Sequence, residues 1–275
     1  MTVFAFTRET GTLGRTVAAE LARQLEIAFV DHDELDARII DRMLRDGDAR
    51  AGSCGGTGAA LAALRADARQ VASYAAEEIM TLALASDVVI RGWEAPAILQ
   101  SIPHVISVRL AAPLPFRVRR LMRRRGISTG SALVEIERDE ACRVAMLRQQ
   151  LGAVQAAPRV QPVFYDAVLN TGRLPVAACV RQLVDLTESR TFRQTAISRG
   201  MLERRIREQQ RDRRSLLGAS GRPAVRPEAC STLTRAAEPS RPVALQSGRM
   251  TAQEAHAVGR AERMLYDGPV FAFRH

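Results

Sequence analysis

The residues best suited to chemistry form a glycine-containing loop near the N-terminus. The segment Thr7–Thr16 (TRETGTLGRT) follows an apolar stretch and precedes one with helical periodicity. Glycines let backbone N–H groups approach a phosphate closely, and the N-terminus of a helix adds partial positive charge. Gly14, Arg15 and Thr16 match the G-K-[ST] end of a P-loop with arginine in place of lysine, whereas Glu9 occupies the position of the first glycine. The loop therefore predicts a phosphate-binding site, with an ordinary glycine turn as the alternative.

The elements around this loop alternate between short apolar runs and segments of helical periodicity. Glycine, proline and serine mark most of the boundaries; Gly126, for example, ends one expected helix and Ser128 caps the next. This alternation predicts a mostly parallel sheet covered by helices on both faces, and it places residues 1–190 in one α/β domain. The expected strands are 2–7, 27–30, 87–91, 104–110 and 166–170, and helices are expected to follow the loop and over 33–44, 58–85, 113–125, 128–150 and 175–186.

Composition limits the partners and the cellular setting. All 40 Lys and Arg residues of the chain are arginine, and the formal net charge is +10. Anionic partners such as nucleotides or nucleic acids are therefore favoured, and the chain must hold a phosphate with backbone N–H groups and guanidinium groups, since it has no lysine ammonium. Aromatic residues make up only 4% of the chain, which disfavours a base-stacking surface for nucleic acid.

The four cysteines are widely scattered, which disfavours a zinc site or a disulfide framework. No apolar run reaches the roughly 18 residues of a membrane span, and no signal peptide is evident, so we expect a cytoplasmic protein.

Six segments of the chain together resemble the cytidylate kinase-like family of P-loop nucleoside monophosphate kinases. They occur in the order of the family and cover about residues 3–190. The family's loop often begins Ser-Arg-Glu-x-Gly and carries a basic residue other than lysine, so the departure at Glu9 is typical of it. The resemblance implies a P-loop NTPase fold, a three-layer α/β/α sandwich. The matching segments are Phe6–Arg15, Phe29–Leu35, Val88–Trp93, Val108–Arg117, Ile136–Asp139 and Tyr165–Thr171.

The resemblance also implies which residues bind the nucleotides, with ATP and Mg²⁺ as cofactors. It places the ATP phosphates in the loop, on Gly11, Thr12, Gly14, Arg15 and Thr16, with Mg²⁺ on the Thr16 hydroxyl. It places the acceptor nucleotide at Asp31, Asp33 and Arg91. The residues alone also allow a structural role for two of these positions. Asp33 is a good helix N-cap, and Arg91 could be a surface arginine at a strand end.

A run of arginines over residues 117–125 resembles the start of a lid that closes over the phosphates. Phosphoryl transfer requires positioning and neutralisation of charge, which arginines on a closing lid can supply. Arg117, Arg120 and Arg124 lie three and four residues apart, on one helical face. A solvated helix face is the alternative for any one of them. The catalytic arginines implied by the resemblance are Arg15, Arg117, Arg138 and Arg143.

The resemblance implies transfer of the ATP γ-phosphoryl group to a pyrimidine monophosphate, CMP or dCMP. The alternative is a nucleotide-binding regulatory protein of the same fold without turnover, because Trp93 and Glu94 stand where relatives usually carry small residues. A third hypothesis is nucleic-acid binding through the arginines of 117–125 and 199–226, which the low aromatic content disfavours.

The C-terminal part of the chain differs in composition from the domain. Residues 191–242 combine a basic helix with a linker rich in glycine, proline and serine. Residues 243–275 resemble the end of a BON domain, which implies contact with a lipid or a protein partner in an α+β appendage. The alternative is a partly disordered basic tail with one helix.

Overall fold

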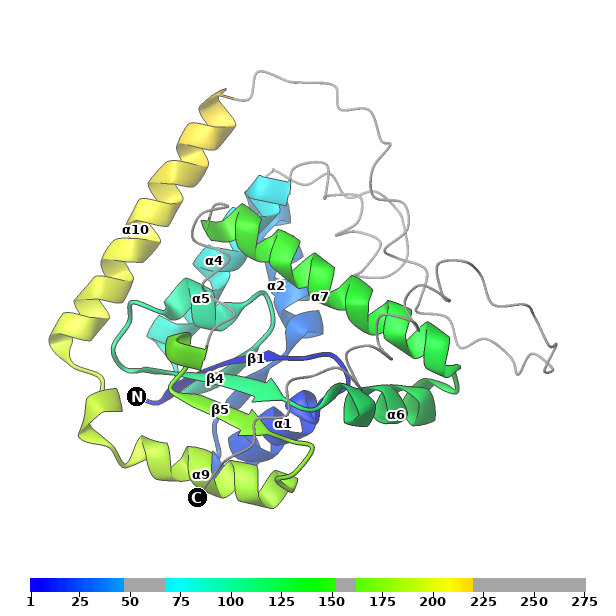
Figure 1. Cartoon of the computed structure of the whole chain (residues 1–275). Helices are drawn as coiled ribbons and strands as arrows, with labels where there is room; N and C mark the ends of the chain where they lie inside the picture. The colour runs from blue at the N-terminus through cyan, green and yellow to red at the C-terminus, as the bar shows by residue number, and fades with distance from the viewer. Residues whose placement is uncertain (47–67, 152–161, 220–275) are drawn as a thin grey trace.

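A parallel five-stranded sheet forms the centre of the protein. The structure is a computed structural model and describes residues 1–46, 68–151 and 162–219 (Figure 1). The strand order is β2-β3-β1-β4-β5, and every pairing is parallel, which confirms the predicted α/β architecture. The strands are β1 (Val3–Arg8), β2 (Ala28–Val30), β3 (Val88–Arg91), β4 (Val105–Ala111) and β5 (Ala167–Asn170).

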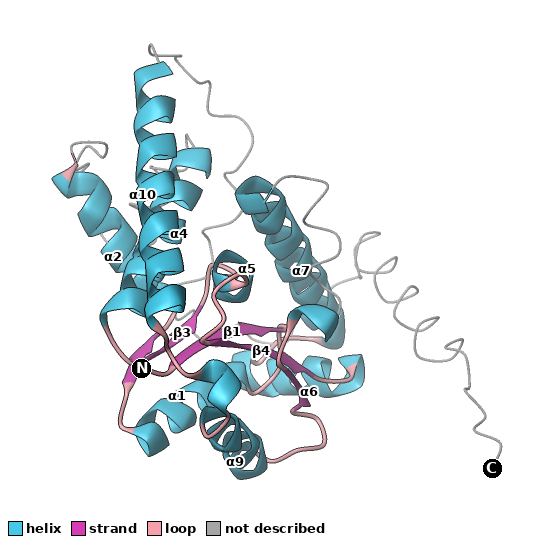
Figure 2. Cartoon of the chain, turned by 90° about the vertical axis from the view of Figure 1, so that its left-hand side faces the viewer, coloured by secondary structure: helices cyan, strands magenta, loops and turns pink. Residues whose placement is uncertain are grey.

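Helices cover both faces of this sheet, giving the expected three layers (Figure 2). Helices α1 and α9 pack on one face, and α2, α4 and α5 pack on the other. The described helices are α1 (Gly14–Leu25), α2 (His32–Arg45), α4 (Ala68–Ala85), α5 (Ala95–Leu99), α6 (Leu114–Arg125), α7 (Thr129–Leu151), α9 (Val176–Thr187) and α10 (Ala196–Ala219), with short 3-10 helices η3 (Pro162–Phe164) and η4 (Arg190–Phe192).

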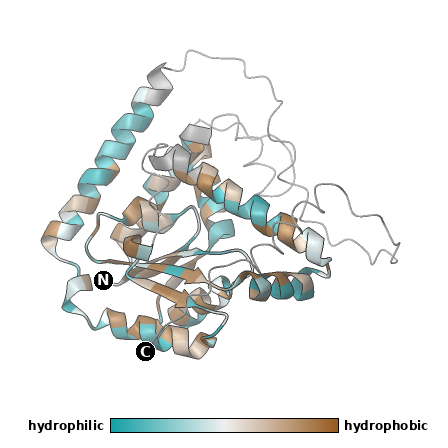
Figure 3. Ribbon diagram, viewed as in Figure 1, coloured by the Kyte–Doolittle hydropathy of each residue, from teal (hydrophilic) through white to brown (hydrophobic). Residues whose placement is uncertain are grey.

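The strands are apolar on both faces because each face contacts a separate core. Val3 and Ala5 of β1 join the core beneath α2 and α4, whereas Phe4 and Phe6 join the core beneath α1 and α9. This division follows from the two-residue period of a strand. Figure 3 shows the hydrophobic strands inside the more hydrophilic outer helices.

Helix α6, which carries the arginine run, and helix α7 together form an arm beside the sheet. Helix α6 ends at Gly126, which has a left-handed φ of +67°, and the Ser128 hydroxyl accepts the N–H of Ser131 at 3.1 Å to cap α7. Both boundaries are as predicted, because glycine tolerates the left-handed region and serine satisfies a free N–H group at a helix start. A small apolar cluster that includes Val118 and Ile136 joins α6 to α7.

Helix α10 packs against α4 although it lies beyond the expected domain end at residue 190. Leu202 is fully buried in the core, and Arg213 stacks on the Tyr74 ring with its guanidinium carbon 4.2 Å from the centroid. Arg213 also forms ion pairs with Glu77, at 3.3 Å, and with Asp46.

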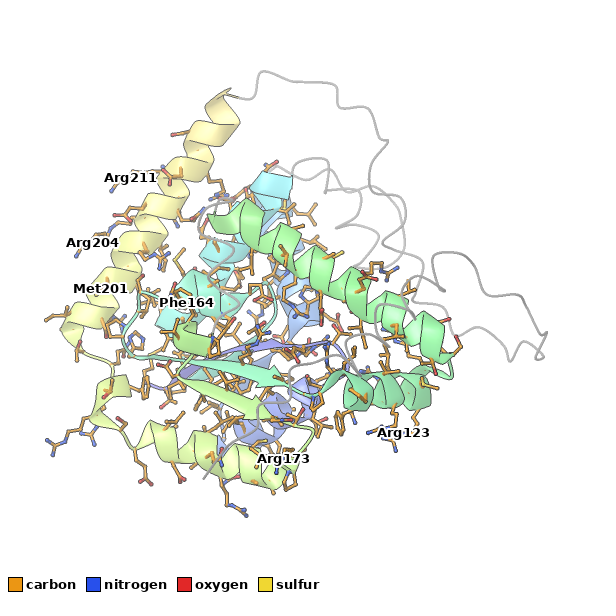
Figure 4. The ribbon with its side chains drawn as sticks, in the orientation of Figure 1. Arg123, Phe164, Arg173, Met201, Arg204 and Arg211 are labelled. Atoms are coloured by element: carbon orange, nitrogen blue, oxygen red, sulfur yellow. The ribbon has the colours of Figure 1, made fainter. Side chains whose placement is uncertain are left out.

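The opposite face of α10 is basic and exposed, and Figure 4 shows Arg204 and Arg211 pointing away from the body. The glycine-rich segment 47–58, the expected linker up to residue 242 and the BON-like segment 243–275 lie outside the described residues. Among the helices that the structure describes, none is long and apolar enough to cross a membrane.

A buried histidine at the start of β4 should make stability depend on pH. His104 is fully buried, and neither ring nitrogen has a hydrogen-bond partner in the described part of the chain. Burial, assisted by the N-terminal ammonium group, lowers the pKa of His104 in the folded state. Below the ordinary histidine pKa of about 6.5, the unfolded chain therefore binds a proton that the folded protein does not. We expect the wild-type Tm to fall more steeply between about pH 7 and pH 5.5 than the Tm of His104→Leu; parallel slopes in the two proteins would contradict this.

Candidate functional site

A cavity of about 640 Å³ opens at the carboxyl ends of β1 and β3. The loop between β1 and α1 forms its floor, the segment after β3 forms one wall, and helices α6 and α7 form the other. Ligands of open α/β sheets bind outside the carboxyl ends of the strands, where connections leave in opposite directions. The cavity lies at that position, since β1 is flanked by β3 on one side and by β4 on the other.

The loop after β1 is held in place by contacts that explain its unusual sequence. Gly11 has a φ of +89°, and a Cβ atom there would lie 2.7 Å from the carbonyl oxygen of Arg117. Glu9, at the position of the first P-loop glycine, does not line the cavity: its carboxylate accepts hydrogen bonds from the N–H of Ala112 and from Arg109 Nη2, both at 3.1 Å. Glu9 therefore fixes the loop to the end of β4, a role that the motif comparison did not reveal.

The N-terminal end of α1 faces the cavity with open hydrogen-bond donors. No hydrogen bond is found from the N–H groups of Gly14, Arg15 or Thr16 to any described residue, and the preceding Leu13 supplies no side-chain cap. Thr12, Arg15 and Thr16 line the cavity, and no acidic residue lies in the first turn. These donors and the positive end of the helix dipole form a suitable environment for an anion.

Asp31 connects the loop to the end of β3. Its carboxylate lies 3.0 Å from Arg15 Nη2 and 3.9 Å from Arg91 Nη2, and it also accepts the N–H of Glu34 at 3.2 Å. Asp31 is thus the N-cap of α2. The alternative assignment of this cap to Asp33 is wrong, because Asp33 is the second residue of α2. Its exposed side chain lines the cavity.

Arg91 is an interior group of the site and not a surface arginine. Its side chain is only 11% exposed, and its Nε is buried without a hydrogen-bond partner among the described residues. Burial lowers the pKa of Arg91, as does the nearby positive charge of Arg15, while Asp31 opposes the shift. A buried donor without a partner is costly, so this arginine is prepared for an anion from outside the chain.

The structure divides the predicted catalytic arginines into two groups. Arg15 and Arg143 line the cavity, but Arg117 and Arg138 do not. Arg117 is buried, and its guanidinium is engaged by the carbonyl of Ala112 at 3.1 Å and by Glu140 at 2.6 Å.

Three further arginines of α6, Arg120, Arg124 and Arg125, do line the cavity. The three arginines on one face of α6 therefore have different surroundings: Arg117 at the base of the arm contacts protein atoms, whereas Arg120 and Arg124 face the cavity.

Glu94 is a buried carboxylate in the wall of the cavity. It accepts the Thr7 hydroxyl at 3.0 Å and lies 3.2 Å from Arg143 Nε. Burial raises the pKa of Glu94, and the positive charge of Arg143 opposes this shift. Trp93 and Glu94 both have left-handed backbone conformations, with φ of +49° and +50°. Such backbone geometry in residues other than glycine costs about 1–3 kcal/mol each and is common at functional sites.

Positive charge dominates the cavity lining. Seven arginines line it against four carboxylates, an excess that suits a polyphosphate. Arg8 is one of the seven and stands at the arginine of the family's Ser-Arg-Glu-x-Gly start. It was not predicted as a site residue, because the general P-loop pattern leaves its position unspecified. The residues are Arg8, Arg15, Arg91, Arg120, Arg124, Arg125 and Arg143, opposed by Asp33, Glu94, Glu135 and Asp139.

Comparison with known proteins agrees with this architecture. A family model described as the cytidylate kinase-like family matches residues 3–173. Among solved structures, an uncharacterized protein from Eubacterium ventriosum ATCC 27560 is 19% identical with a TM-score of 0.53, covering 69% of this chain and 100% of that one. A shikimate kinase from Bacteroides thetaiotaomicron is 20% identical with a TM-score of 0.43, covering 68% of this chain and 99% of that one. The first of these supports the fold alone. No curated protein matches the sequence.

Proposed function

Since the chain belongs to the cytidylate kinase-like family, we propose that it transfers the γ-phosphoryl group of ATP to a pyrimidine nucleoside monophosphate, CMP or dCMP. One observation carries this proposal. A single arginine-rich cavity joins the open N-terminus of α1 to a buried arginine, Arg91, that has an unpartnered donor. Two anion-binding environments in one cavity suit a reaction between two phosphorylated molecules.

The ATP phosphates are proposed to lie on the loop between β1 and α1. Gly11 allows close backbone approach, and the N–H groups of Gly14, Arg15 and Thr16 are free to donate. The exposed Thr16 hydroxyl is the proposed protein ligand of Mg²⁺. In such sites the ion is held largely by the substrate phosphates, and it neutralises their charge. Thr12 stays among the proposed phosphate contacts, although its hydroxyl donates to the Glu9 carbonyl at 2.7 Å.

The acceptor monophosphate is proposed to lie at the end of β3. Arg91 supplies the guanidinium for its phosphate, and Asp31 positions both Arg91 and Arg15 through the ion pairs described above. Asp33, exposed at the cavity on the first turn of α2, is the proposed contact for the sugar or base.

During transfer, an oxygen of the acceptor phosphate attacks the γ-phosphorus and ADP leaves. The chain then has to orient the two phosphates and stabilise negative charge on the transferred group. Arg15 and Arg143 are proposed for that stabilisation, with Arg120 and Arg124 added from α6. Arg117 is proposed to act indirectly, because its guanidinium joins the Thr10 carbonyl of the loop to Glu140 of α7. Arg138 is exposed and does not line the cavity, and no hydrogen bond or ion pair to a described residue assigns it a role.

An ADP-release assay with ATP, Mg²⁺ and a panel of CMP, dCMP, UMP, AMP, GMP and shikimate tests this function. We expect release with CMP or dCMP, and we expect Arg91→Gln to raise the KM for that acceptor by about 10- to 100-fold, since a hydrogen bond to a charged group contributes about 1.5–3 kcal/mol. Arg173→Gln removes an exposed arginine outside the cavity lining and should leave KM unchanged.

Failure to release ADP with every acceptor would reject the proposed transfer. If ATP still raised the Tm in that case, the protein would be a nucleotide-binding member of the family without turnover. The buried anion Glu94 beside the phosphate region favours this second function.

A further inference from the structure

Arg8 occupies the position in the cavity from which a cation can reach the start of α1. It is the last residue of β1, and its side chain lines the cavity. The aliphatic part of that side chain crosses Gly14: a Cβ atom at Gly14 would lie 2.7 Å from Arg8 Cδ and 2.9 Å from Arg8 Cβ. The stem of Arg8 therefore contacts the first residue of α1, and Arg8 shares one cavity with the open N–H groups of that turn.

Within the described ranges, no hydrogen bond or ion pair within 4.0 Å joins the guanidinium of Arg8 to another residue. Among the other arginines that line the cavity, Arg15, Arg91, Arg125 and Arg143 each form an ion pair, whereas Arg120 and Arg124 have none in these ranges. Its charged neighbours are mainly positive: burial and the charges of Arg91, Arg143 and Arg124 lower the pKa of Arg8 to about 10, opposed by Asp139. Mutual repulsion among partly buried arginines is relieved when a polyanion binds between them.

Arg15, which aligns with the P-loop lysine in the sequence, is placed differently. Its side chain is 62% exposed, and its Nη2 lies 3.0 Å from Asp31 Oδ2. It is therefore held on the acceptor side of the cavity by a carboxylate. Moving it to the ATP phosphates would require this ion pair to break, whereas Arg8 has no pair to break.

We propose that Arg8, and not Arg15, is the cation that holds the ATP phosphates before the acceptor binds. Arg15 remains paired with Asp31 in that state and acts only when both substrates are present. This inference rests on the proposed function, because it concerns the same nucleotide site. It assigns the electrostatic role of the missing lysine to a residue at the opposite end of the loop.

Binding measurements without an acceptor test this assignment. Arg8→Met keeps an unbranched stem over Gly14 and removes the charge and the N–H donors of the guanidinium, and Arg15→Met is the matched control. With ATP and with inorganic tripolyphosphate as probes in calorimetry, we expect Kd to rise about 10- to 100-fold in Arg8→Met and less than about threefold in Arg15→Met. Arg8→Lys should recover part of the affinity because it restores the charge. An equal or larger loss in Arg15→Met, or unchanged binding in Arg8→Met, would overturn the inference.

Chemical footprinting gives a second test that needs no variant. Phenylglyoxal modification of the wild-type protein, followed by mass spectrometry, should label Arg8 without ligand and protect it with ATP, while labelling of Arg15 changes little. Protection of Arg15 without protection of Arg8 would overturn the inference even if Arg8→Met does not fold.

The two proposals fail separately. Tripolyphosphate binding that depends on Arg8, in a protein that releases no ADP, would support the Arg8 assignment and reject the kinase function. Normal ADP release by Arg8→Met at low ATP would support the kinase function and reject the Arg8 assignment.

Discussion

Replacing Gly11 with alanine should lower ADP release about 100-fold and the free energy of unfolding by about 2–3 kcal/mol. The φ of +89° is unfavourable for any residue with a Cβ atom. The new methyl group would also meet the backbone and side chain of Arg117 at 2.7–2.9 Å. Because Arg117 is buried and bound to Glu140, the loop has to move instead, which displaces the N–H groups that face the cavity. Urea denaturation and the ADP-release assay measure the two effects.

Gly126→Ala is the matched control for this change. Gly126 also has a left-handed backbone, with φ of +67°, but a Cβ atom there would meet nothing within 4 Å. Its replacement should cost only about 1 kcal/mol of stability and leave ATP binding intact. Similar losses in both variants would show that backbone strain alone, and not the contact with Arg117, explains the requirement for glycine at position 11.

Leu202→Asp should lower the free energy of unfolding by about 4 kcal/mol. Leu202 is fully buried where α10 meets the core beneath α4. A carboxylate at this position would have to lie in an apolar environment or detach the helix, and detachment would also free Arg213 from Tyr74 and Glu77. Urea denaturation followed by circular dichroism measures the loss.

Ile197→Asp provides the comparison on the same helix. Ile197 is 78% exposed, so its replacement should change stability by no more than about 0.5 kcal/mol. If Leu202→Asp were equally mild, α10 would not be part of the folded domain. The folded domain would then end near residue 190, as expected from the sequence, and α10 would lie outside it.

Local sequence determined the elements of this protein. The strands β1 and β4 are predicted by their mainly apolar runs, because parallel strands buried on both faces carry apolar residues at most positions. Gly126 and Ser128 mark the α6–α7 boundary through their own backbone and hydrogen-bonding properties. The position of the glycine-containing loop, between β1 and α1, likewise follows from the short-range pattern and from the resemblance, and the family match confirms that resemblance.

Only the tertiary structure decided what the charged side chains contact. Arg117, Arg120 and Arg124 are equivalent by spacing, yet Arg117 is buried against Glu140 and the other two face the cavity. Asp31 and Asp33 are both plausible caps, and the difference depends on where α2 begins relative to Arg15. The direction of a side chain and the distance between elements far apart in the chain are set by packing, and helical or strand periodicity does not encode them.

The same reason applies to Arg8, Glu94 and α10. A motif specifies which residues are allowed at a position, but the surroundings of Arg8 come from β3, α6 and α7, and those of Glu94 come from β1 and α7. The amphipathic character of α10 is visible in its sequence, whereas its docking on α4 depends on Tyr74 and Glu77, more than a hundred residues earlier. Sequence alone therefore located the loop that lines the cavity. The folded chain determined which charges meet there, because long-range electrostatic and packing contacts exist only once the sheet has assembled.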